Sequence, residues 1–306
     1  MSSNLKISEW FDIWYDSQTH IKQSTKSIYQ SYANKHLKPK MGTVRLKKLS
    51  RDLIQQFIDE LSIELSPKTV RAVYSMLKLC LTAAYEKHLI GNVVDKICLP
   101  KTVSKDVKVL TKQEQKRLEQ VIEAENKEND IGILICLYTG IRIGELCALK
   151  WENINLDRKI MTIDKTMYSV QSNDGKCKTK IILSSPKSVN SERDIPIAEL
   201  LSEKLSKIQK SEGFVINRNG KYIEPAVYSR RYKKLLEKAG IEYMMFHSTR
   251  HTFSVRAREL GVDVQTLSEI LGHSSVSTTL NFYGHSLPEH KHNQMERIGG
   301  LFSQSK

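Results

Sequence analysis

The stretch His247-Ser-Thr-Arg250-His251 opens the most informative part of this chain, and Leu271-Gly-His273 and Tyr283-Gly-His285 follow it. A fourth stretch, Thr139-Gly-Ile-Arg-Ile-Gly-Glu-Leu146, lies far upstream. Together they place two arginines, two histidines and a tyrosine in a fixed order along the sequence. Each of these residues is unremarkable alone, but the set supplies the groups that a reaction at a phosphodiester needs.

A phosphodiester is an anion, so cutting it requires charge neutralisation, a nucleophile and a proton donor for the departing oxygen. Arg142 and Arg250 could supply two guanidinium forks, which pair two oxygens and stay charged. Arg142 follows a Thr-Gly turn and stands between two isoleucines, so its surroundings are expected to be apolar. A buried arginine needs an anion as its partner. The hydroxyl of Tyr283, with an ordinary pKa near 10, becomes a nucleophile only beside a base and within a cationic field. His247 and the arginines could provide both.

Other interpretations of the same residues are less specific. His247 and His251 have the HxxxH spacing of zinc sites, but the glutamate of HExxH is missing and Arg250 would stand beside the metal, which argues against zinc. Tyr283 also continues an apolar stripe with Val276 and Leu280, so it could be a core residue.

Charge points to a polyanionic partner. The chain has 306 residues with 48 Lys and Arg against 34 Asp and Glu, a net charge of +14. Residues 1–105 carry 17 basic and 9 acidic side chains, so the first third is the more basic part per residue. Phosphate contacts to lysine and arginine dominate affinity for nucleic acid. No run is long and apolar enough to cross a bilayer, the N-terminus lacks a secretion signal, and the five scattered cysteines suit a reducing compartment. We therefore expect a cytoplasmic protein with no membrane association.

The chain divides into two expected domains. Residues 101–109 are polar, lysine-rich and without helical periodicity, and they are typical of a linker. Residues 1–100 before it predict a helical bundle, in which Ser66 caps a helix with Pro67 at its first position. The expected helices are 5–18, 24–36, 50–62 and the one that starts at Ser66. Basic residues on two helix faces are candidate DNA contacts or merely solvated surface: Lys26, Lys68, Arg71 and Lys78.

Residues 110–306 mix helices and strands. Thr111 and Glu114 form a capping box that opens a helix, and residues 130–138 predict a buried helix ended by Gly140. Strand-like runs at 160–163, 180–183 and 194–197 alternate with polar turns. The fold class expected is α+β, mainly helical, with a small antiparallel sheet in the second domain.

The joint pattern resembles the tyrosine recombinase family, and the likeness covers essentially the whole chain. It implies a SAM-like core-binding domain before residue 100, including a turn at 39–42, and a catalytic domain after the linker. It also implies that Glu145 supports the first arginine. The resemblance implies that Lys187 is the acid that protonates the departing oxygen. A lysine-rich insertion at 165–182 leaves Lys176, Lys178 and Lys180 as competitors for this role. The catalytic residues that the resemblance implies are Arg142, Lys187, His247, Arg250, His273 and Tyr283.

The resemblance further implies a reaction and its partners. Tyr283 would attack double-stranded DNA at attachment-type sites, forming a 3′-phosphotyrosyl bond that stores the energy of the broken bond, so neither ATP nor an essential metal is needed. Integration or excision of a phage or mobile element would follow. A tail of hydrophobic residues near 294–302 would dock on a neighbour in a cyclic homotetramer on two duplexes; the alternative is that it packs on its own domain. A directionality factor or a host DNA-bending protein would be accessory partners.

Three alternatives stay open at this point. A cellular recombinase that resolves chromosome dimers would use the same residues, and a type IB topoisomerase would rejoin the same strand. A DNA-binding regulator without enzymatic activity is a different class, against which the apparently intact set of six residues argues.

Overall fold

The computed structural model describes residues 4–102, 107–171, 179–184, 192–273, 275–283, 295–296 and 299. The chain divides into two compact units. The first contains residues 1–105 together with 169–180, and the second contains residues 106–168 and 181–306. Each unit has its own hydrophobic core.

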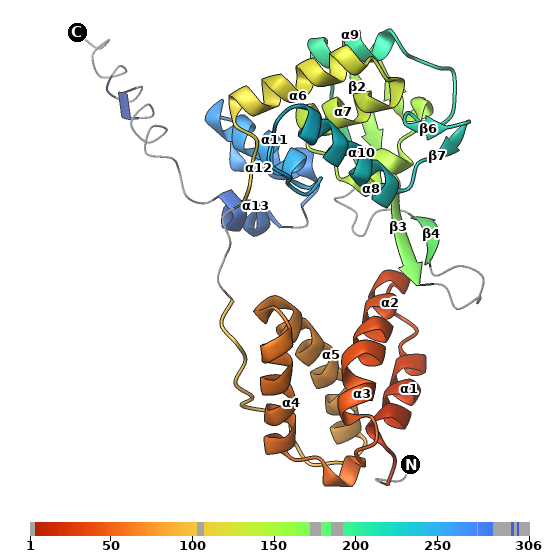
Figure 1. Ribbon diagram of the computed structural model, residues 1–306, viewed down its shortest axis with the longest axis vertical. Helices are drawn as coiled ribbons and strands as arrows, with labels where there is room; N and C mark the ends of the chain where they lie inside the picture. Colours follow the sequence, from red (N-terminus) through yellow and green to blue (C-terminus); the bar gives the residue numbers. More distant parts are fainter. Residues whose placement is uncertain are drawn as a thin grey trace. The chain divides into compact units, whose positions relative to one another are not determined.

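The first unit is a bundle of helices (Figure 1). A π-helical turn, η1 (Ala33–Leu37), continues α2 without a break into a short helix, and a 3₁₀ turn, η2 (Leu46–Lys48), precedes α4. The segment 39–42, expected to be a turn, is therefore largely helical, and this expectation was wrong. Pro39 lies in the first turn of that short helix, where its missing N–H costs nothing. The α-helices of the unit are α1 (Ile7–Ser17), α2 (Gln23–Tyr32), α3 (Lys38–Met41), α4 (Arg51–Glu64) and α5 (Pro67–Glu86).

Local sequence signals set the ends of the two longest helices of this bundle. Ser50 Oγ accepts a hydrogen bond from the Leu53 amide at 3.2 Å, and Ser66 Oγ accepts one from Thr69 at 3.3 Å. Helix α5 buries an apolar stripe of Val70, Val73, Leu77, Leu81 and Ala84. Trp10 of α1 is fully buried and donates its indole N–H to the Cys80 carbonyl of α5 at 2.9 Å, which fixes one helix against the other.

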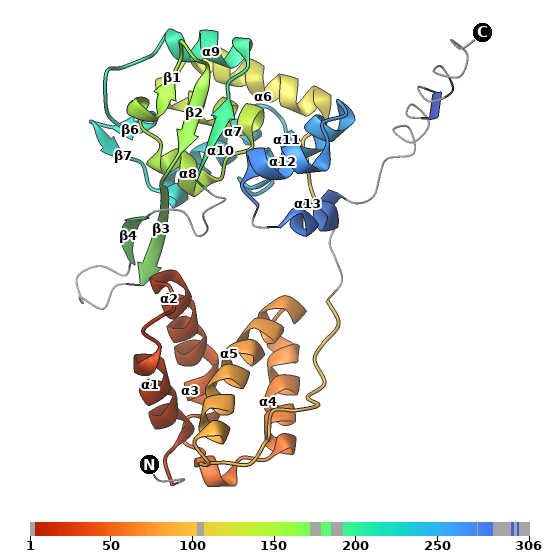
Figure 2. The same ribbon diagram turned by 180° about the vertical axis from the view of Figure 1, so that it is seen from behind.

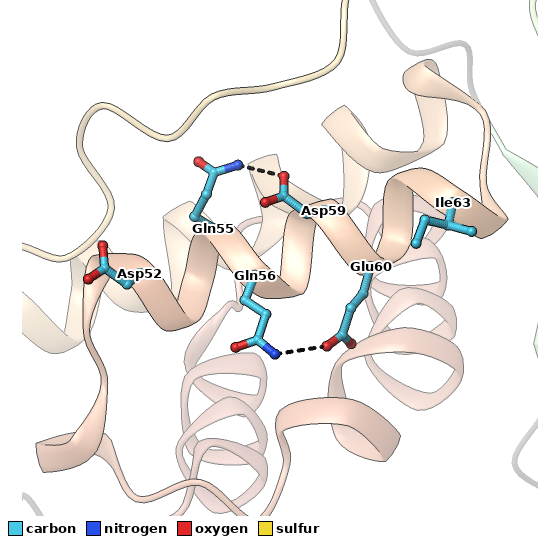
Figure 3. Close-up of a pocket in the computed structure, with 6 residues that line it drawn as sticks. All are labelled: Asp52, Gln55, Gln56, Asp59, Glu60 and Ile63. Carbon is cyan, nitrogen blue, oxygen red and sulfur yellow. Dashed lines mark hydrogen bonds between the residues drawn. The ribbon is translucent and has the colours of Figure 1, made fainter.

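The exposed face of α4 is acidic and polar. A shallow pocket on it is lined by Asp52, Gln55, Gln56, Asp59, Glu60 and Ile63. Figure 3 shows two side-chain hydrogen bonds along this face, Gln55 to Asp59 and Gln56 to Glu60, both four residues apart. The carboxylates of this face repel phosphate, so we assign it no part in binding DNA.

The second unit combines helices with a small sheet (Figure 2). Its helices are α6 (Lys112–Glu125), α7 (Ile131–Thr139), α8 (Ile143–Ala148), α9 (Glu199–Ser206), α10 (Pro225–Lys238), α11 (Ser248–Glu259), α12 (Val264–Leu271) and α13 (Val276–Tyr283), with 3₁₀ turns η3 (Glu128–Asp130) and η4 (Trp151–Asn153). The capping box of Thr111 and Glu114 and the end of α7 at Gly140, with φ +69°, are as expected.

The strands pair only with antiparallel neighbours where their register is described. Strands β1 (Ile154–Asn155), β2 (Ile160–Ile163) and β5 (Arg193–Pro196) form one sheet in the order β1-β2-β5, and Met161 faces Ile195, both buried. Two further pairs are β3 (Thr166–Gln171) with β4 (Thr179–Ser184), and β6 (Asn217–Arg218) with β7 (Lys221–Tyr222). Strand β3 falls in the segment that was expected only as an insertion.

A mainly helical α+β fold with small antiparallel sheets is therefore confirmed. Helix α7 is apolar all round and lies in the core of the second unit, packed against α11. Helices α11, α12 and α13 lie together at one end of this unit in both views (Figures 1 and 2). Among the described helices, none combines the length and the apolar character needed to cross a membrane.

Candidate active site

Arg142 is held at the amino end of α8 by its own helix. It is the N-cap residue, and its backbone N–H donates to Glu145 Oε2 at 2.9 Å. Its guanidinium Nη1 donates to Glu145 Oε1 at 2.7 Å. The Arg142 side chain keeps 36% of its surface exposed. One helical turn therefore fixes the direction of a cation that still reaches solvent.

Glu145 joins Arg142 to a second arginine. Its carboxylate is 3% exposed and also accepts from Arg193 of β5, whose Nη2 lies 3.1 Å from Oε2. Burial opposes ionisation of Glu145, but the charges of Arg193 and Arg142 outweigh it and hold the pKa of this carboxyl below its ordinary value. Glu145 is therefore an anion shared by two guanidinium groups.

The carboxyl end of α12 is the second support of the arginines. Arg250 of α11, which is almost fully buried, donates from Nη2 to the Leu271 carbonyl and from Nη1 to the Gly140 carbonyl, both at 2.8 Å. Arg142 donates to the carbonyls of Leu271 at 3.3 Å and Gly272 at 3.2 Å. Arg193 Nε donates to the Ile270 carbonyl at 2.5 Å.

The last carbonyls of a helix have no partner within it and form the negative end of its dipole. Here the guanidinium groups of Arg142, Arg193 and Arg250 take these carbonyls as acceptors. We call this arrangement, the three arginines with residues 270–272 and Glu145, the arginine cradle. It holds three positive charges beside each other before any anionic substrate arrives.

Gly272 is required where α12 ends. It adopts the left-handed conformation, with φ +64°, and a Cβ at this position would lie 2.9 Å from Arg193 Nη1. Any other residue would therefore strain the backbone and push against the cradle. The same turn places His273 directly after the cradle.

His247 and His251 are neighbours at the start of α11. His247 is the N-cap residue, and the two rings meet edge to face with centroids 4.6 Å apart. Partial burial, His251 and the cations Arg250 and Arg142 lower the pKa of His247 to about 4, so at neutral pH it is uncharged and able to accept a proton. No third His, Cys, Asp or Glu joins them into a metal-binding group within the described ranges.

His273 lies in the same field of charge. Burial, followed by Arg250, Arg142 and Arg193, lowers its pKa to about 4. Its Nδ1 is 2.7 Å from the hydroxyl of Thr279, a fully buried residue of α13. The structure therefore brings Arg142, Arg250, His247 and His273 into one electrostatic neighbourhood.

Tyr283 is the last residue of α13, and its side chain lies outside what the structure describes. Of the stripe that it was expected to continue, Leu280 is 49% exposed and Val276 is only partly buried, so those two residues are not part of the core. The catalytic role of Tyr283 stays a prediction.

The lysine candidates are not brought to the cradle by any described contact. Lys187, Lys176 and Lys178 lie outside the described residues, and Lys180 is an exposed residue of β4. Which lysine acts as the acid stays open.

The candidate DNA contacts all lie on helices of the first unit. Lys68, Arg71 and Lys78 are exposed on α5, and Arg71 also donates to the Pro100 carbonyl at 3.2 Å. Lys26 of α2 is half-buried, with its ammonium group 5.2 Å from the ring centre of Tyr15. Their spacing puts the three α5 residues on one helical face, which fits a contact surface and leaves the role a prediction.

Arg193 was missed as a site residue. The sequence contains a signal for it, since Arg193 directly precedes the Asp-Ile-Pro-Ile run, where a strand was expected. A buried arginine at the start of a core strand needs an acidic partner, and Glu145 is one of two carboxylates that are buried among the described residues.

Comparisons with known proteins agree with this geometry. Residues 108–290 match the model of the phage integrase family, and residues 6–62 match that of the phage integrase N-terminal SAM-like domain. A XerC-like tyrosine recombinase of Caldanaerobacter subterraneus subsp. tengcongensis is 29% identical over 264 residues, which cover 78% of this chain and 67% of the relative. The ICEBs1 integrase of Bacillus subtilis is 26% identical over 302 residues, 94% of this chain and 79% of the relative.

Among solved structures, the Tn1549 transposon integrase in complex with a circular intermediate DNA has the same fold, with a TM-score of 0.81 at 19% identity. The similarity covers 96% of this chain and 99% of that one. Because the phage integrase match alone spans more than half of the sequence and encloses the whole arginine cradle, the chain belongs to the phage integrase family of tyrosine recombinases.

Proposed function

We propose that Tyr283 cuts DNA by forming a 3′-phosphotyrosyl bond at an attachment-type site, and that the chain integrates or excises a mobile element in this way. The single observation that carries the proposal is the arginine cradle. It holds three guanidinium groups, from α8, β5 and α11, in one electrostatic field with two uncharged histidines. DNA as the substrate is supported by the solved integrase of the same fold, which is bound to DNA.

The arginines would bind the non-bridging oxygens of the scissile phosphate. Arg142 makes three hydrogen bonds in the cradle, to Glu145, Leu271 and Gly272, out of the five N–H groups of a guanidinium. On that count two of its N–H groups can point at phosphate. Arg250 would supply the second positive charge from within the core.

The histidines and a lysine would move the protons. His247, uncharged at neutral pH, takes the proton of the Tyr283 hydroxyl as the phenolate oxygen attacks phosphorus in line. The bond from phosphorus to the 5′-oxygen breaks, and Lys187 protonates that oxygen. His273 donates a hydrogen bond to the transition state. The 5′-hydroxyl of a second DNA strand then attacks the phosphotyrosine and restores the tyrosine.

Covalent trapping tests this proposal. The protein is mixed with nicked DNA that carries the junctions flanking its own gene, in the presence of EDTA, and run on a denaturing gel. We expect an adduct on the 3′ side of the nick that Tyr283→Phe abolishes. Tyr243→Phe is the matched control, since this tyrosine is half-exposed and should be dispensable. An adduct that survives in Tyr283→Phe would exclude this nucleophile.

The identity of the acid needs a separate experiment. A substrate with sulfur in place of the 5′-bridging oxygen releases a thiolate, which leaves without a proton. We expect this substrate to restore cleavage by Lys187→Ala and not by Arg142→Ala. If this substrate instead restores cleavage by Lys176→Ala, Lys178→Ala or Lys180→Ala, the acid is that lysine of the insertion.

We also propose the domain roles and the assembly. Residues 1–100 would be the core-binding domain, 101–109 the linker and 110–306 the catalytic domain, with DNA contacts from Lys26, Lys68, Arg71 and Lys78. Exchange of both strands of two duplexes uses four active sites, hence a cyclic homotetramer. The tail that would link neighbours lies outside the described residues apart from 295–296 and 299. Deleting residues 293–306 should abolish synapsis while one-site DNA binding survives in a gel-shift assay.

A second candidate is a cellular recombinase that resolves chromosome dimers. The similarity to a XerC-like recombinase favours it as the runner-up. The two are separated by recombination assays, because an integrase joins the junctions of its own element, whereas a dimer-resolving enzyme acts on a chromosomal site.

A further inference from the structure

Thr279 uses its buried hydroxyl differently from three other buried hydroxyls of the same unit. In α7 and α11, Thr139, Thr252 and Ser254 each donate to the carbonyl four residues earlier, at 2.6, 2.8 and 2.9 Å. That is the usual bond of a buried hydroxyl within a helix. Thr279 Oγ1 instead lies 2.7 Å from Nδ1 of His273, outside its helix. The side chain of Thr279 is fully buried, so water does not compete for this bond.

The bond joins the end of α12 to α13, and the proposed cleavage depends on the relative position of these two segments. His273 follows the end of α12, directly after the carbonyls that hold Arg142 and Arg250. Thr279 lies on α13, four residues before Tyr283, so the two positions share one face of that helix. The contact between Thr279 and His273 therefore connects the arginine cradle to the helix that carries the nucleophile.

The direction of this bond and the position of the proton on the His273 ring depend on each other. An uncharged imidazole has one N–H and one bare nitrogen. A hydroxyl that donates to Nδ1 leaves the proton on Nε2. Only this tautomer presents an N–H donor to a phosphate oxygen from the nitrogen on the far side of the ring.

We propose that Thr279 is a positioning residue for DNA cleavage, which fixes the Nε2–H tautomer of His273 and holds α13 in register with the arginine cradle. The proposal rests on the proposed function of Tyr283 and His273. It assigns to Thr279 no contact with DNA, so its loss should slow cleavage and leave binding unchanged.

Two substitutions separate the hydroxyl from the packing. Thr279→Val keeps the branched shape and removes the hydrogen bond, whereas Thr279→Ser keeps the hydroxyl. We expect Thr279→Val to lower the single-turnover rate of adduct formation at least about 10-fold, less than the ~10²–10³ that losing a direct transition-state donor costs. Its DNA affinity should stay within about 2-fold of the unmodified protein, and Thr279→Ser should restore most of the rate. The control is Ser277→Ala, which removes an exposed hydroxyl from the same helix.

A second readout does not depend on activity. Nitrogen-15 NMR of the ring distinguishes the two tautomers, and His273→Gln assigns the signal. We expect Nε2–H in the unmodified protein and a mixture in Thr279→Val. A proton on Nδ1 in the unmodified protein would overturn the proposal, as would unchanged cleavage by a folded Thr279→Val. If Thr279→Val does not fold, the proposal is tested by the tautomer of His273 in the unmodified protein and by the cleavage rate of Thr279→Ser. Absence of any adduct with the unmodified protein would count against the proposed function instead, and the NMR result would stand.

Discussion

Replacing Glu145 by glutamine should lower the stability of the second unit more than the same replacement of an exposed glutamate does. The carboxylate accepts from the Arg142 backbone at 2.9 Å, from Arg142 Nη1 at 2.7 Å and from Arg193 Nη2 at 3.1 Å. Glutamine has one acceptor oxygen and would point its NH₂ group at a guanidinium. Two arginines would then share a buried site with no anion.

The size of the effect follows from burial. Removing one partner of a buried ion pair costs about 3–5 kcal/mol, because the other charge stays buried without compensation. Arg193 is 7% exposed and meets this condition, whereas Arg142 is 36% exposed and is partly solvated. We therefore expect the lower end, about 3 kcal/mol. A folded chain is stable by about 5–15 kcal/mol, so Glu145→Gln should still fold.

Native-state hydrogen exchange is the appropriate assay, because a chain of two units need not unfold in one step. Amides of α8 and α12 should open more easily by that amount, and those of α5 should not change. Glu123→Gln is the matched control, since Glu123 pairs with Lys204 and is 60% exposed, and such pairs contribute about 0–1 kcal/mol. Equal effects of the two substitutions would refute the role given to Glu145.

Three further predictions concern the same region. Gly272→Ala should cost about 1–2 kcal/mol from its left-handed conformation alone, measured as a shift of the urea midpoint, and more if the cradle moves. Folding stability should be greatest above pH 6.5 and fall toward pH 4, because the unfolded chain takes up protons that His247 and His273, with pKa values near 4, do not. Urea midpoints at pH 7.5 and pH 5 test this, and a midpoint that rises in acid would contradict it. Arg142→Lys and Arg250→Lys should each slow adduct formation by roughly 10²–10³ although the charge is kept, because the fork is lost; cleavage at the normal rate would show that charge alone suffices.

The helices of the fold could be predicted because their signals are local. Ser66 with Pro67, Thr111 with Glu114, and Gly140 each mark a helix end within one turn of sequence, and all three are where they were expected. The segment 39–42 was misread because a proline and a glycine three residues apart also suit a turn. A proline in the first turn of a helix gives the same sequence signal.

The residue types of the site could be predicted, but their support could not. Arg142, Arg250, His247 and His273 were chosen from short motifs, and the structure gathers them. Arg193 lies 48 residues from Glu145 in sequence, and the carbonyls that receive Arg142 lie about 130 residues away, so no local pattern links them. Contacts to backbone carbonyls leave no mark on residue identity at all.

That last property gives the arginine cradle an evolutionary consequence. A carbonyl oxygen is present whatever side chain stands at positions 270 and 271, so substitutions there that preserve the helix cannot delete an acceptor for the arginines. Sequence drift in α12 is then limited by its packing and by the glycine at 272. A lineage of such enzymes can therefore diverge widely in this helix and keep its catalytic geometry.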